Sequence, residues 1–287
     1  MSMKHFLSRA CCASVMALAI VAFVQTPITA THNWGGGTKG YHWQRTSSAI
    51  RYIKIRRYHS SVWLTRFATA YAKWRSSSMT KVRPILGSTG GGKNPCPFAA
   101  GQITSCDGSY GNTGWLGLAS IYVGGSGHIT QGTSKVNNTY FNTAYYNTIP
   151  WRQLVICQEI GHNFGLGHVN VTYNTANTGS CMDYTNDPDG GRGGVSATDP
   201  SNMNPNAHDY ALINSKHNHT GSAMLLPGFE SELEREPEMP AALVAFNPVK
   251  LSELGVLVQV GDGGRTETYE RDFANGYKAI TSVIRAR

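Results

Sequence analysis

One short stretch near the middle of the chain, Q-E-I-G-H-N-F-G-L-G-H, constrains the fold more than any other feature. On a helix, Gln158 and His162 are four residues apart, so their side chains lie one turn apart on the same face. Gly165 permits a sharp turn after the helix, which brings His168 back towards the same point. We therefore expect Gln158, His162 and His168 to hold one metal ion. Glu159 points in a neighbouring direction, from which it can reach a water on that ion.

A second stretch downstream reads S-C-M-D-Y, from Ser180 to Tyr184. Together the two stretches resemble the metzincin signature H-E-x-x-H-x-x-G-x-x-H and its S-x-M-x-Y Met-turn, with Gln158 in place of the first His. Their order and separation also match those of the metzincins. The resemblance implies an α+β, metzincin-like fold with a mixed sheet, an active-site helix and a Met-turn, plus a small C-terminal β-segment.

The resemblance also implies an activity, a cofactor and a set of residue roles. It indicates a zinc-dependent endopeptidase that hydrolyses peptide bonds with a metal-activated water, with Zn²⁺ as cofactor and a peptide or protein as substrate. By position, Gln158, His162 and His168 are the expected metal residues. Glu159 is the expected catalytic base. Tyr184 matches the second catalytic residue of the astacin-like and serralysin-like branches, which ligates the metal and then stabilises the tetrahedral intermediate.

Three further features follow from the resemblance. Met182 would form the hydrophobic floor under the metal. The strand expected from Leu116 to Val123 resembles the edge strand along which metzincins bind an extended substrate, since an edge offers free backbone donors and acceptors. A Cys157–Cys181 disulfide would clamp the Met-turn to the active-site helix.

The departure at Gln158 leaves three outcomes open, because an amide oxygen is a poorer zinc ligand than an imidazole nitrogen. In the first outcome, which we favour, Gln158 binds zinc through its oxygen. Alternatively, another histidine supplies the missing nitrogen, or the site is catalytically inactive. The histidines available by sequence are His128, His208, His217 and His219.

The N-terminus has the layout of a secretory signal peptide. Lys4 and Arg9 precede an apolar run from Ala10 to Val24, and an A-x-A-like site ends at Ala30. The run is short for a membrane span, so an uncleaved anchor helix is the weaker alternative. We expect a secreted protein, cleaved near Ala30, with no stable membrane insertion.

Cysteine usage agrees with secretion. Cys96, Cys106, Cys157 and Cys181 remain after cleavage, and three pairings are open to them. We favour Cys96–Cys106 because it closes a short loop. The formal net charge is +8, but the basic residues are scattered except at 51–57, where no nucleic-acid motif appears. We expect no nucleic-acid partner, and the sequence gives no indication of the oligomeric state.

Periodicity and turn residues divide the chain as follows: a signal peptide at 1–30, an N-terminal segment at 31–48, a metallopeptidase domain at 49–222, a linker at 223–240 and a small β-segment at 241–287. We expect strands at 49–57, 81–86, 116–123, within 128–140, at 255–260 and at 278–284. We expect helices at 60–76, from 150 towards 165, and at 205–219, the last one capped by Asn204. Residues 87–114 are expected to form one long loop.

Two other functions are compatible with the sequence. The first alternative is a catalytically weakened or inactive metzincin-like scaffold that binds peptides or proteins. The second is an adhesive module whose C-terminal β-segment binds a partner. Glu159 distinguishes these functions from the endopeptidase, because only the endopeptidase requires a base at that position.

Overall fold

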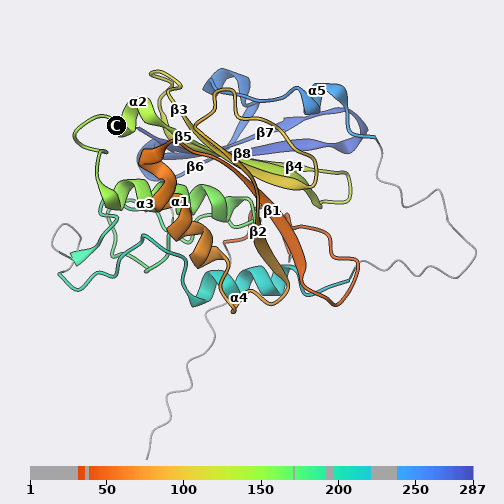
Figure 1. Ribbon diagram of the computed structural model, residues 1–287, viewed down its shortest axis with the longest axis horizontal. Helices are drawn as coiled ribbons and strands as arrows, with labels where there is room; N and C mark the ends of the chain where they lie inside the picture. Colours follow the sequence, from red (N-terminus) through yellow and green to blue (C-terminus); the bar gives the residue numbers. More distant parts are fainter. Residues whose placement is uncertain (1–31, 36–38, 171, 192–196, 221–237, 287) are drawn as a thin grey trace, which may run out of the picture.

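A computed structural model describes residues 32–35, 39–170, 172–191, 197–220 and 238–286. The signal peptide expected at 1–30 lies outside the described residues, as does most of the linker expected at 223–240. The described chain is α+β, as predicted, and is built on one mixed sheet of eight strands (Figure 1). The strands are β1 (Arg51–Tyr58), β2 (Val82–Gly90), β3 (Gln102–Gly108), β4 (Trp115–Val123), β5 (Ile129–Asn137), β6 (Val256–Val260), β7 (Thr266–Asp272) and β8 (Lys278–Arg285).

The sheet has a parallel half and an antiparallel half, in the order β2-β1-β3-β5-β4-β8-β7-β6. β1 pairs in parallel with β2 and β3, and β3 pairs in parallel with β5. β4 runs antiparallel to both of its neighbours, β5 and β8. β7 and β6 extend the antiparallel half to its edge. The C-terminal strands therefore continue the main sheet.

The helices are α1 (Ser61–Trp74), α2 (Asn138–Phe141), α3 (Ile149–His162), α4 (Ala207–Lys216) and α5 (Ala241–Val244). α1 and α3 lie on the same side of the sheet (Figure 1), where α3 packs against β4 and β5. The Trp74 indole at the end of α1 is buried and donates to the Cys157 carbonyl of α3 at 2.9 Å. This contact holds α1 against α3, the helix that carries Gln158, Glu159 and His162.

The prediction that the Leu116–Val123 segment is an edge strand was wrong. β4 has the predicted position in the chain, but it lies inside the sheet with a partner along each side. Its second partner, β8, comes from the far end of the sequence and pairs with it from Trp115↔Arg285 to Val123↔Lys278. Such a long-range pairing cannot be predicted from the sequence of β4 alone.

Three other expectations differ from the structure. The long loop expected at 87–114 contains the end of β2 and all of β3. β3 was missed because its buried residues are largely polar. Two of them have partners outside the strand: His59 bonds to Ser105, and the Ser60 hydroxyl donates to Asp107. β7 was not expected at all. Asn206, not Asn204, caps α4, since its side chain accepts from the backbone N–H groups of His208 and Asp209.

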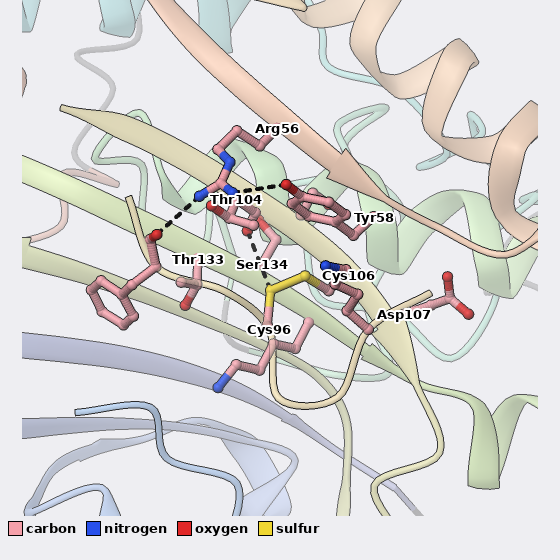
Figure 2. Close-up of a disulfide and its surroundings, with 12 residues drawn as sticks. Arg56, Tyr58, Cys96, Thr104, Cys106, Asp107, Thr133 and Ser134 are labelled. Carbon is pink, nitrogen blue, oxygen red and sulfur yellow. Dashed lines mark hydrogen bonds between the residues drawn. A yellow bond between two sulfur atoms is a disulfide. The ribbon is translucent and has the colours of Figure 1, made fainter. Parts of the chain in front are cut away.

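Both predicted disulfides are confirmed. Cys96–Cys106 joins the loop after β2 to β3, and Cys157–Cys181 joins α3 to the segment before Met182. Figure 2 shows Arg56 and Tyr58 beside the first bridge, with the Arg56 guanidinium donating to the Tyr58 hydroxyl at 2.7 Å. Two disulfides are compatible with an extracellular protein. Among the described residues, no helix combines the length and the apolar character needed to cross a bilayer.

Candidate metal centre

The last turn of α3 lies in the interior of the protein. Thr148 caps its N-terminus by accepting from the Trp151 backbone N–H, and Pro150 occupies the first turn, where its missing N–H is not needed. Every residue from Trp151 to His162 is buried. The polar side chains of the last turn therefore have to find their partners inside the protein.

His162 and His168 lie next to each other, with ring centroids 4.8 Å apart and the rings nearly perpendicular. Gly165, at a φ of 80°, makes the turn between them. The His162 Nδ1 donates to the Leu166 carbonyl at 2.8 Å, so the neutral ring carries its lone pair on Nε2. That Nε2 and the Nε2 of His168 are both buried and have no hydrogen-bond partner. Burial lowers the pKa of His162 to about 4 and lowers the pKa of His168 well below its usual value.

Glu159 is fully buried, and neither of its carboxyl oxygens has a hydrogen-bond partner. Burial raises the pKa of this carboxyl well above its usual value. β4 passes so close that a Cβ at Gly117 would collide with the carboxyl group, which explains the glycine there. Glu159 and the two imidazoles thus present buried acceptor atoms that have no hydrogen-bond partner, which is costly unless a cation or water lies beside them.

Gln158 is buried in the same turn, and its amide nitrogen donates to the Asp183 carbonyl at 2.9 Å. This bond uses the nitrogen end of the amide. Oε1 is then the atom through which Gln158 can bind a cation. Gln158, Asp183 and Tyr184 line one pocket, together with apolar side chains from β4, α3 and β8.

The segment 180–184, whose sequence resembles a Met-turn, lies against the last turn of α3. Met182 is fully buried, and a Cβ on Gly161 would collide with its sulfur. The Cys157–Cys181 disulfide joins the same two segments. The Tyr184 ring is buried, with its centroid 6.1 Å from that of His168. The last turn of α3, which carries Gln158, Glu159 and His162, thus lies close to three residues that follow it in the sequence: His168, Met182 and Tyr184.

The C-terminal strand β8 is paired with β4 beside this site. Gly117, which touches Glu159, pairs with Ile284 of β8. Ile284 lines the pocket beside Gln158, while Ser282, two residues earlier on the same face, lines a cavity with His162 and His168. β8 therefore occupies the side of β4 on which the metzincin resemblance places a substrate.

The N-terminal segment also reaches the site, which the sequence did not reveal because residues 31–48 have no periodic pattern. The Trp34 ring lies with its centroid 5.1 Å from that of His162. His32 and Trp34 line the cavity that contains His162 and His168. Only the tertiary fold brings these residues together.

The four histidines considered as substitute ligands lie elsewhere. Within the described chain, two groups of three His, Cys, Asp or Glu side chains are close enough to hold a metal: His42, His128 and His219, and His32, His208 and Asp209. Neither group contains His162 or His168. Both ring nitrogens of His217 are hydrogen-bonded, one to the Ile213 carbonyl and one to the Trp43 N–H. The alternative in which one of these residues supplies the missing nitrogen has no support in the structure.

Comparison with known proteins adds no relative to this description. No protein-family model matches the chain, and no curated protein matches it in sequence.

Proposed function

We propose that this protein is a secreted, zinc-dependent endopeptidase with a metzincin-like fold. The observation that carries the proposal is the set of buried atoms at the end of α3 that have no hydrogen-bond partner: the Nε2 atoms of His162 and His168 and both oxygens of Glu159. Such atoms are rare in folded proteins, because each costs about 1–3 kcal/mol. A zinc ion with a water beside it provides partners for the whole set, and imidazole is a typical zinc ligand.

Each residue has a defined task in this proposal. Gln158, through Oε1, holds the ion with His162 and His168. When bound, zinc polarises the peptide carbonyl and lowers the pKa of water. Glu159 accepts the proton of the attacking water and passes it to the leaving amine, for which a buried carboxyl with a raised pKa is suited. The Tyr184 hydroxyl donates a hydrogen bond to the carbonyl oxygen as negative charge develops on it.

A second function is favoured by two specific observations. The nitrogen of Gln158 is held by Asp183, and an amide oxygen is a weaker zinc ligand than an imidazole. In addition, β8 covers the side of β4 that an extended substrate would use. A catalytically inactive scaffold that binds peptides or proteins accommodates both facts. In such a scaffold Glu159 has no task.

The test compares the full mature chain with its Glu159→Gln variant. We expect zinc in both proteins by elemental analysis, and casein cleavage that falls at least about a hundredfold in the variant, since a general base contributes about 10²–10⁴-fold. Glu238→Gln, at an exposed glutamate, is the matched control and should cleave like the wild type. A wild-type protein that binds no zinc and cleaves neither casein nor gelatin would reject the endopeptidase and leave the binding scaffold.

A further inference from the structure

Asp209, in the first turn of α4, has one carboxylate oxygen with partners and one without. Its Oδ2 accepts from the Ser180 hydroxyl at 2.7 Å and from the Asn206 backbone N–H at 2.8 Å. Its Oδ1 is buried and has no hydrogen-bond partner. A buried carboxylate oxygen without a donor is costly unless a cation lies beside it.

His32 presents a second acceptor atom to the same place. Its Nδ1 donates to the Gly167 carbonyl at 3.1 Å, so the neutral ring carries its lone pair on Nε2. That Nε2 lies 3.6 Å from Asp209 Oδ1 and 3.2 Å from His208 Nδ1. A lone pair and a carboxylate that face each other repel unless a cation lies between them.

His208 completes the group. Its Nδ1 faces His32, and its Nε2 is buried without a hydrogen-bond partner. One ligand atom from each of His32, His208 and Asp209 lies within 4.8 Å of the other two. A single proton between His32 and His208 would make one hydrogen bond and leave Asp209 Oδ1 without a donor, whereas a metal ion is a partner for all three residues.

We propose that His32, His208 and Asp209 form a second metal site, here called the tether site, which takes a divalent transition-metal ion such as Zn²⁺. Two imidazoles and one carboxylate are a typical ligand set for such ions. Mg²⁺ and Ca²⁺ prefer oxygen ligands, so the tether site discriminates against them. His208 is partly exposed, which leaves a side open for solvent to complete the coordination.

The tether site ties the N-terminal segment to the loop that carries His168. Backbone bonds already join the two: Gly167 N–H donates to the His32 carbonyl at 2.7 Å, and Trp34 N–H donates to the Gly165 carbonyl at 3.1 Å. A metal ion held by His32 from one side and by α4 from the other links all three segments. This role is structural and does not depend on the endopeptidase proposed above.

The experiment measures zinc binding by calorimetry and elemental analysis on the full mature chain. A His162→Gln background removes the candidate metal centre, so that the tether site is observed alone. In that background we expect zinc to bind, and the added change His208→Gln to weaken binding at least about tenfold, because loss even of outer-shell partners costs about 10–100-fold. His128→Gln, from the other histidine group, is the matched control and should leave the affinity unchanged.

Three results would overturn the tether site: no zinc bound in the His162→Gln background, equal affinity with and without His208→Gln, or a loss caused by His128→Gln instead. His208→Gln in the otherwise unchanged chain gives a second measurement, in which the zinc content should fall by one equivalent per chain. Asp209 is kept in both variants because it also caps α4. If zinc binds at the tether site but casein is not cleaved, the endopeptidase fails and the tether site stands.

Discussion

The chemistry of the candidate metal centre depends on a single amide. Gln158 stands where the metzincin signature has its first histidine, but the Asp183 carbonyl already accepts a hydrogen bond from its nitrogen. The side chain is thereby kept in one orientation, in which Oε1 is the atom that can bind a cation. A neutral oxygen ligand beside two imidazoles should give a zinc site that loses its metal more readily than one with three imidazoles.

The change Gln158→His tests this interpretation. An imidazole at this position should slow the loss of zinc to a chelator by about tenfold or more, because it replaces a weak ligand with a strong one. Release is followed with a colorimetric zinc indicator after EDTA is added. The control is Gln153→His, which places a histidine at another buried position of the same helix. Unchanged release from Gln158→His would mean that Gln158 does not contact the metal.

At this scale, the sequence predicts what lies within one local stretch and misses what the fold assembles. His162 and His168 could be found because they share one helix and its turn. His32 and Asp209 could not, since one lies in the N-terminal segment and the other in α4, and no sequence spacing relates them. The two residues come close only in the folded chain, where His32 is hydrogen-bonded to Gly167 and Asp209 lies in the first turn of α4.

Among the elements, β8 has the largest consequence for function. It lies antiparallel to β4, directly across from Gly117. Its Ile284 and Ser282 line the cavities at the candidate metal centre. If the protein cleaves extended peptides along β4, β8 has to separate from that strand before a substrate can pair with it. The endopeptidase proposal therefore requires a movement of β8.

A reversible crosslink between β4 and β8 tests that requirement. The hydroxyls of Ser120 and Thr281 lie 2.8 Å apart on paired residues, so the double change Ser120→Cys and Thr281→Cys should allow a disulfide across the two strands. We expect the oxidised protein to lose casein cleavage and to recover it after mild reduction. Wild type carried through the same redox steps is the control. Full cleavage by the oxidised protein would show that the substrate enters without displacing β8.

The elements differ in how far the sequence predicts them. α1 and α3 were predicted because apolar residues recur at helical spacing, and because Thr148 and Pro150 mark the start of α3. β3 was missed since it buries polar side chains, and the partners of Ser105 and Asp107, which lie between β1 and α1, come close only after folding. The position of β4 was correct, but its neighbour was not, because strand order depends on pairing between the two ends of the chain.

At the scale of the whole molecule, the described interior contains several lysines and histidines whose protonated form is disfavoured. Lys135 and Lys216 are buried and donate to the carbonyls of Pro248 and Gly165. His42 and His217 are buried near each other, with ring centroids 5.8 Å apart. In each case burial favours the neutral side chain. Together these groups determine how the free energy of unfolding depends on pH.

We expect the metal-free protein to become more stable as pH rises from about 4 to about 10, whereas most proteins are most stable between about pH 5 and 8. Burial lowers the pKa of His42 to about 4 and that of His217 well below its usual value, so stability falls as pH drops from about 6.5 to about 4. Burial lowers the pKa of Lys135 and Lys216 to about 7, so stability also falls between pH 10.5 and 7. Asp209, whose pKa burial raises to about 6, and Glu159, whose pKa burial raises well above its usual value, act in the opposite sense, but they are outnumbered by the buried histidines and lysines. Urea unfolding at about pH 5, 7 and 9 should therefore give a midpoint that increases at each step, and a midpoint that peaks near pH 7 would show that these side chains are charged in the folded state.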